Sequence, residues 1–239
     1  MDKPIDKMNL LQKKRFYDKL QISSQELSHL GVAWLLFILA FVPMSIYRFR
    51  IDYSDESTLF LTISLMAFAI GFSFIFHELG HKFSAQCFNA KAEFKLDQRG
   101  LLITVVSIAL GFYLLAPGAV FWNSNLSKYS NIRGRVSASG PIVNLHLASI
   151  SLGLFIFQGA PTGSIEWMLF TFGYISFYLN VYLGLFNMLP VWILDGKKIF
   201  EWSEMVWLAY ITMFIILILA FRLVFTGPEW AFNFFIISI

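Results

Sequence analysis

The sequence predicts an all-α membrane protein with about five to six transmembrane helices and one re-entrant or β-hairpin segment near residues 101–122. Hydrophobic residues make up 57% of the 239-residue chain and charged residues 14%. In soluble domains, by comparison, about 45–50% of the residues are apolar and about 25% are charged. The apolar residues also occur in long runs, which is typical of helices that cross a bilayer. Too few polar residues are present to cover a globular surface, so the composition excludes a soluble enzyme, a disordered tail and a nucleic-acid binder.

The predicted elements follow the apolar stretches in order. Ser23 and Glu26 match a capping box, which predicts that the first helix begins there. The apolar stretches cover residues 30–47, 59–88, 101–122, 136–157, 167–194 and 206–225. Residues 230–239 are also apolar, but they supply only about half of the ~20 residues that a helical crossing needs.

Charges in the loops predict the orientation, because cytoplasmic loops carry an excess of lysine and arginine. The N-terminal segment is rich in these residues, and so are the loops near residues 91–99, 128–135 and 197–198. The loop at 48–58 is net negative, and the loop at 158–166 has no lysine or arginine. We therefore expect the N-terminus and the four basic segments on the cytoplasmic side of a multi-pass protein.

The stretch at 101–122 is flanked by basic loops on both sides, so it is expected to enter and leave the membrane on the same side. Gly111 and the Ala116-Pro117-Gly118 break suit a re-entrant hairpin or a pair of strands. The alternative is a plain crossing helix that a proline interrupts.

The strongest chemical signal is the pentapeptide His77-Glu78-Leu79-Gly80-His81. Residues four apart share one face of a helix, so the two imidazoles can bind one Zn²⁺. Glu78 would then lie beside the ion, where it can take a proton from a metal-bound water. A chance match is disfavoured, because two histidines and a carboxylate within an apolar span are costly unless they pair or bind something.

A catalytic zinc ion usually takes three protein ligands and a water, so a third ligand must come from elsewhere. Among the acidic residues after His81, only Asp195 lies at the end of an apolar run. Pro190 is expected to break the preceding helix, and Gly196 to allow a sharp turn. Taken alone, Asp195 would be interpreted as an interfacial helix cap beside two lysines.

Together these motifs resemble those of the site-2 protease family of intramembrane zinc metalloproteases. The HELGH pentapeptide and the N-x-x-P-x(4)-D-G pattern of residues 187–196 match in the family's order. Residues 139–144, between them, resemble the family's G-P-x-x-N segment. The resemblance covers residues 59–200, the three-span catalytic core of the family.

The resemblance implies a role for each matched residue. His77, His81 and Asp195 would bind one zinc ion per chain, and Glu78 would be the general base. Asn187 would steady the substrate carbonyl or oxyanion. Asn144 is a candidate for support of the active site or the substrate, and a helix–helix hydrogen bond is the alternative of equal weight.

The sharing of one ion also constrains the topology. His77 and Asp195 each follow an apolar run, so both runs are expected to point toward the cytoplasm, with one full crossing between them at 136–158. If 101–122 also crossed, the two motifs would lie on opposite faces of the membrane. In the family the equivalent region forms strands beside the site, and one of them can align an extended substrate by strand addition.

The resemblance therefore implies a zinc metalloendopeptidase that hydrolyses peptide bonds of single-span membrane proteins, as in regulated intramembrane proteolysis. Its active site would lie toward the cytoplasmic side of the lipid bilayer. The implied division is a cytoplasmic segment (1–28), a first transmembrane helix with its outer loop (29–58), the three-span core (59–200) and a C-terminal transmembrane region (201–239). The oligomeric state stays open.

Two alternatives remain. One is an intramembrane zinc protease of the type that trims prenylated proteins, which usually takes a glutamate as its third ligand. The other is a non-enzymatic membrane protein, such as a metal transporter or an inactive scaffold. A single site without an acidic outer vestibule disfavours the transporter, and the presence of Glu78 with all three candidate ligands disfavours the scaffold.

Overall fold

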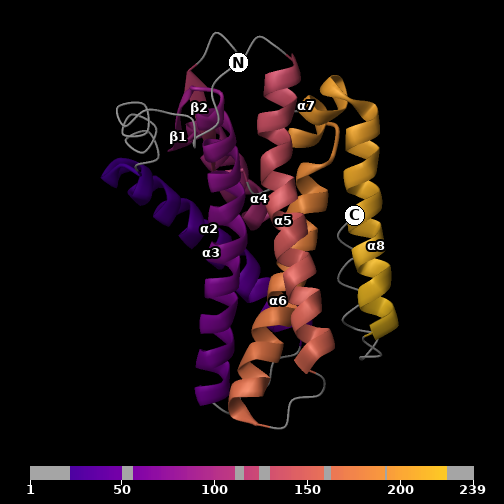
Figure 1. The fold of residues 1–239 in the computed structure, drawn as a ribbon. Coiled ribbons are helices and arrows are strands. Elements are labelled where there is room, and N and C mark those ends of the chain that lie inside the picture. Colours follow the sequence, from indigo (N-terminus) through magenta and orange to yellow (C-terminus); the bar gives the residue numbers. More distant parts are fainter. Residues whose placement is uncertain are drawn as a thin grey trace, which may run out of the picture.

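The computed structural model describes residues 22–49, 56–110, 116–123, 130–158, 163–191 and 193–224. These residues form seven helices and one small two-stranded sheet (Figure 1). The mostly helical fold that the sequence predicts is confirmed. The basic N-terminal segment before residue 22, most of the loop at 48–58 and the apolar tail at 230–239 lie outside the described residues, and the division into segments stays a prediction.

Five of the described helices are long: α2 (Ser24–Phe49), α3 (Glu56–Cys87), α5 (Ser130–Gln158), α6 (Ser164–Asn187) and α8 (Glu204–Val224). Four of them contain a stretch long and apolar enough to cross a membrane, namely Ser24–Pro43, Leu59–Cys87, Ile165–Asn187 and Glu204–Leu223. The described part of the chain is therefore built as a multi-pass membrane protein.

Helix α5, the crossing expected at 136–158, differs from these four. It has the length of a span, but Arg133, Arg135 and a series of polar side chains in its middle lower its apolarity. It packs against α3, α6, α7 and α8, and its Asn144 is fully buried. Polar side chains are tolerated at membrane depth where protein rather than lipid surrounds them, which is the position of Asn144.

Helix α3 ends in a turn that leads directly into the sheet. Asn89 adopts the left-handed conformation, with a φ of 60°. The N–H of Ala90 donates to the carbonyl of Ala85 at 3.1 Å, and the N–H of Asn89 to that of Gln86 at 2.9 Å. This is a Schellman-type end, which stops the helix. Strand β1 (Lys91–Leu96) therefore begins beside the end of α3 that carries the two histidines.

The region around 101–122 forms a strand pair with a helix in the connection. Strand β2 (Gly118–Asn123) pairs antiparallel with β1, from Lys91 opposite Asn123 to Leu96 opposite Gly118. Between the strands lies α4 (Gln98–Ala109), whose 12 residues at ~1.5 Å each span about 18 Å, less than the ~30 Å of a hydrocarbon core. Because the strands are paired, the chain returns to the place it left.

The strand pair expected near 101–122 is confirmed. Its first strand is upstream of 101–122, and a helix occupies the first half of that stretch. The helix starts there because Asp97 is its N-cap, and its carboxylate accepts the N–H of Gly100 at 2.8 Å. Strand β1 alternates charged and apolar residues, so a search for long apolar runs passes over it.

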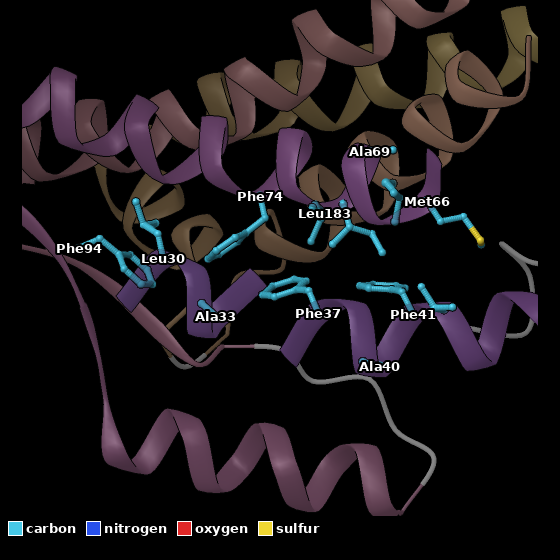
Figure 2. Close-up of a cluster of buried hydrophobic side chains, with 13 residues drawn as sticks. Leu30, Ala33, Phe37, Ala40, Phe41, Met66, Ala69, Phe74, Phe94 and Leu183 are labelled. Carbon is cyan, nitrogen blue, oxygen red and sulfur yellow. The ribbon is translucent and has the colours of Figure 1, made fainter. Parts of the chain in front are cut away.

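Aromatic packing joins α2 to α3 and the sheet (Figure 2). The rings of Phe37 on α2 and Phe74 on α3 stack with centroids 4.5 Å apart. Phe94 of β1 meets Phe74 edge-on at 5.8 Å. Within a bilayer such packing gains van der Waals contact rather than hydrophobic burial, since lipid tails are as apolar as the side chains. The cluster holds β1 beside α3.

The first turn of α2 contains a buried ion pair. Ser23 caps the helix as the sequence predicts, because its Oγ accepts the N–H of Glu26 at 3.0 Å. The Glu26 carboxylate, which a capping box would direct to the helix start, binds Lys82 Nζ at 2.5 Å and accepts the N–H of Phe94 at 3.0 Å. Both charged side chains are 1% exposed. Glu26 therefore joins three elements, α2, α3 and β1.

Candidate metal centre

Two helices from distant parts of the sequence supply the candidate ligands. Helix α3 carries His77 and His81 one turn apart, on a face toward α5. Helix α6 ends at Asn187, and an irregular segment that contains Pro190 leads to α7 (Asp195–Trp202). Asp195 is thus the first residue of α7. Helix α7 lies at the same end of the bundle as the two strands (Figure 1).

His77, His81 and Asp195 are buried and offer one ligand atom each, all within 4.8 Å of one another. The two Nε2 atoms are 3.1 Å apart, and Asp195 Oδ2 lies 2.9 Å from that of His81 and 3.5 Å from that of His77. Ligands at ~2.0–2.1 Å from a tetrahedral zinc ion are about 3.3–3.4 Å apart. The three observed separations lie around that value, so these residues fit a metal ion.

Both imidazoles are held from behind by hydrogen bonds. Nδ1 of His77 lies 2.6 Å from Asn144 Oδ1, and Nδ1 of His81 lies 2.8 Å from the carbonyl oxygen of Val136. Amide and carbonyl oxygens only accept, so each Nδ1 carries the proton and donates it. Each Nε2 then keeps its lone pair, directed at the space beside Asp195. Such outer hydrogen bonds fix the tautomer and the ring orientation of a metal-binding histidine.

The surroundings of Asp195 favour the ionised form of its carboxyl group, which is the form that binds a metal ion. Burial alone would raise the pKa of its carboxyl, but the net shift is to well below the usual range, and the positive charge of Lys198 contributes to it. Lys198 Nζ donates to Oδ1 at 3.3 Å, which leaves Oδ2 facing the histidines.

Two glycines permit the close packing of this site. A Cβ at Gly140 of α5 would lie 2.4 Å from His81 Nε2, so only glycine lets α5 pass so near the imidazoles. A Cβ at Gly196 would lie 2.1 Å from the carbonyl oxygen of Met188. Gly196 has no positive φ and lies in the first turn of α7, so the expected sharp turn at Gly196 is wrong. The glycine is needed because α7 starts against the end of α6.

Glu78, the expected general base, is half-buried on α3 beside the cluster. Its carboxylate accepts the backbone N–H of Val120 in β2. Asn187, the residue expected to bind the oxyanion, is not directed at the cluster in this structure. Its side-chain amide donates to the carbonyl of Leu183 in its own helix at 3.0 Å. The catalytic roles of Glu78 and Asn187 stay predictions.

Asn144 makes a contact that bears on each interpretation that the sequence left open, and its role in the active site stays a prediction. It contacts a candidate ligand, His77, and it also bonds Asn180 of α6 at 2.8 Å and the Ser73 carbonyl of α3 at 3.2 Å. The sequence did not predict the parts of Asn180 and the Val136 carbonyl, whereas Lys198 is one of the two lysines expected beside Asp195. An asparagine within the apolar run of α6, away from the motif at its end, is a signal that could have pointed to Asn180.

Comparisons with known proteins agree with this chemistry. The chain is 34% identical over 162 residues to a protein described as "Putative zinc metalloprotease MJ0611" from Methanocaldococcus jannaschii, covering 66% of this chain and 80% of that one. It is 32% identical over 160 residues to "Putative zinc metalloprotease YwhC" from Bacillus subtilis, covering 60% and 72%. No family model and no solved structure matches the chain.

Proposed function

The chain belongs to the same family as these two relatives, the site-2 protease family, and from this premise we propose that it is an intramembrane zinc endopeptidase. The observation that carries the proposal is the buried group of His77, His81 and Asp195. Two imidazoles and one carboxylate are the donor set of many catalytic zinc sites, which keep a fourth position open for water or substrate.

The proposed chemistry is peptide hydrolysis. Zinc at this position would supply a Lewis acid that polarises the scissile carbonyl and lowers the pKa of its water. Glu78 takes a proton from the attacking water and delivers it to the leaving amine. Asn187 donates to the developing oxyanion, which requires its side-chain amide to leave the Leu183 carbonyl.

Strand β2 is well placed to present an extended substrate. In the register of the sheet, Phe94 of β1 lies opposite Val120 of β2. The N–H of Phe94 is bound by Glu26, on the outer side of β1, and the N–H of Val120 faces Glu78. We therefore assign the substrate to the β2 edge, where strand addition would place its backbone beside the base.

The proposed substrates are single-span membrane proteins, cut near or within their spans. The excess of lysine and arginine in the loops supports a topology with the N-terminus and the metal centre toward the cytoplasm. A prenyl-protein type of protease is disfavoured, because an aspartate rather than a glutamate completes the group. A transporter is disfavoured, because a path would need several sites and the described ranges contain one such group.

Metal content tests the proposal. We expect about one zinc ion per purified chain, retained in Glu78→Gln and reduced in Asp195→Ala, because only the second change removes a ligand. Cleavage of a single-span substrate in reconstituted vesicles should be lost in both variants. A wild type without zinc, or Asp195→Ala with undiminished zinc, would contradict the proposed site.

A further inference from the structure

A chain of buried polar groups leads from His77 into the middle of the helix bundle. Asn144 of α5 and Asn180 of α6 are both 0% exposed, and Asn144 Nδ2 donates to Asn180 Oδ1 at 2.8 Å. Unpaired amides at this depth would be costly, because neither lipid nor apolar side chains can bond them. The arrangement therefore holds each amide in one orientation.

The orientation of Asn144 follows from its neighbours. The carbonyl oxygen of Ser73 only accepts, so the atom that faces it at 3.2 Å must be Asn144 Nδ2. Asn144 Oδ1 then faces His77, and the Nδ1 of His77 must donate to it. If the amide were reversed, an NH₂ group would face His77 Nδ1, and the other tautomer would place the proton on the Nε2 that a metal needs.

Asn180 contacts the Asn144 amide on the side away from His77 and helps to hold it in that orientation. Its Nδ2 donates to the Ser176 carbonyl at 2.8 Å and to Ser73 Oγ at 2.9 Å, which leaves Oδ1 as the atom for Asn144. The bond between the two amides, at 2.8 Å, is shorter than the bond from Asn144 to the Ser73 carbonyl, at 3.2 Å. Asn180 thus supplies a second acceptor for Asn144 Nδ2, beside the Ser73 carbonyl.

We propose that Asn180 is a positioning residue of the metal centre, which fixes the Asn144 side chain and through it the tautomer and ring orientation of His77. This inference rests on the proposed function only in that His77 must bind the metal. Asn180 touches neither the ligand atoms nor, in the proposed mechanism, the substrate. Asn180 also binds Ser73 Oγ on α3 at 2.9 Å, so the experiment must separate a path through Ser73 from the proposed path through Asn144.

A double-mutant cycle on the full-length, detergent-solubilised protein tests this path. Zinc affinity is measured by competition with a chelator for the wild type, Asn144→Leu, Asn180→Leu and the double variant. We expect a loss of roughly 10–100-fold in Asn144→Leu and about 10-fold in Asn180→Leu, as for other outer-shell partners. The double variant should bind zinc no more weakly than Asn144→Leu, because Asn180 acts through Asn144. The proposal would be overturned if the two single losses of affinity multiplied in the double variant, or if Asn180→Leu bound zinc as tightly as the wild type.

Three further measurements separate positioning from general stability. Phe177→Leu is the matched control, since Phe177 is 1% exposed on the same helix and packs against Phe221 rather than the amides. It should lower the thermal midpoint and leave zinc affinity unchanged. Asn180→Asp keeps the acceptor that Asn144 uses and should recover most of the affinity. The visible spectrum of the Co²⁺-loaded protein should change in Asn180→Leu and stay unchanged in Phe177→Leu. A loss of affinity in Phe177→Leu equal to that in Asn180→Leu would refute the positioning role.

The two proposals fail differently. A wild type that binds no zinc contradicts the proposed function and this inference with it. A wild type whose tight zinc binding depends on Asp195, combined with unchanged affinity in Asn180→Leu, removes only the role of Asn180.

Discussion

Gly140 shows how one missing methyl group shapes the metal centre. The two histidine rings lie where a Cβ of Gly140 would be, with distances of 2.4 Å to His81 Nε2 and 2.7 Å to His77 Cε1. The close approach of α5 also brings the Val136 carbonyl to His81. Gly140 of the G-P-x-x-N segment is therefore a glycine because a side chain there would collide with the histidine rings, and not because its backbone needs extra freedom.

Gly140→Ala should therefore weaken metal binding. The added methyl group must displace the imidazoles or α5, a strain on the order of 1–3 kcal/mol. We expect reduced zinc content and a lower thermal midpoint in detergent. Gly153→Ala is the matched control on the same helix, because nothing lies within 4 Å of its Cβ position. Equal zinc content in Gly140→Ala and wild type would show that this contact does not limit the site.

The buried ion pair between Glu26 and Lys82 is a second feature that a single substitution can test. Glu26→Ala leaves a buried ammonium group and the Phe94 N–H without their shared partner. Breaking a buried pair from one side costs roughly 3–5 kcal/mol. We expect a large loss of thermal stability, and a substantial recovery in the double variant Glu26→Leu, Lys82→Met, which removes both charges.

An exposed pair provides the comparison. Arg133 and Glu201 also pair at 2.5 Å, but their side chains are 42% and 41% exposed. Glu201→Ala should change stability by less than about 1 kcal/mol, because solvent screens such pairs. A comparable thermal shift in Glu26→Ala and Glu201→Ala would contradict the structural role of Glu26.

At the scale of elements, the sheet and α4 form one unit beside the metal centre. Helix α4 buries Gly100, Thr104 and Ser107 and exposes Leu102 and Val105. This is the reverse of a helix that faces water, and it suits a helix whose outer face meets lipid. The inner, polar face supports the returning chain, since Thr104 Oγ1 accepts the N–H of Ala116 at 3.1 Å.

The β2 edge carries a prediction at this scale. Val120→Pro removes the backbone N–H that faces Glu78, while Val120→Ala keeps it. If an added substrate strand takes this N–H from Glu78, Val120→Pro should slow cleavage by roughly 10–100-fold, the value of one lost backbone hydrogen bond of ~1–3 kcal/mol. Zinc content should be retained in both variants. Equal cleavage rates in the two variants would argue against strand addition at β2.

For the whole molecule, orientation is the property that a single experiment can test. Cys87, the one cysteine in the sequence, lies exposed at the end of α3. The basic loops predict that this end faces the cytoplasm. A membrane-impermeant maleimide should therefore label the protein in inverted membrane vesicles and not in right-side-out vesicles, with Cys87→Ser as the blank. Labelling only from the outside would reverse the predicted topology.

Local patterns were enough for much of the architecture. Long apolar runs predicted the spanning helices, because the bilayer imposes length and apolarity on each segment separately. The HExxH spacing predicted that His77 and His81 share a face, because helical periodicity is local. The breaks at Gly111 and Pro117 and the flanking charges indicated a returning segment, but not that β1 is its first strand.

Spacing along single segments was thus enough to predict the membrane class and the histidine pair, whereas Asp195 as third ligand followed from the family resemblance. The packing of the helices brings Asp195 to the histidines, pairs Glu26 with Lys82 rather than with its own helix start, and sets Asn180 against Asn144. Those contacts join segments far apart in the chain. They depend on how helices pack against one another, and residue spacing along the sequence carries no direct record of that packing.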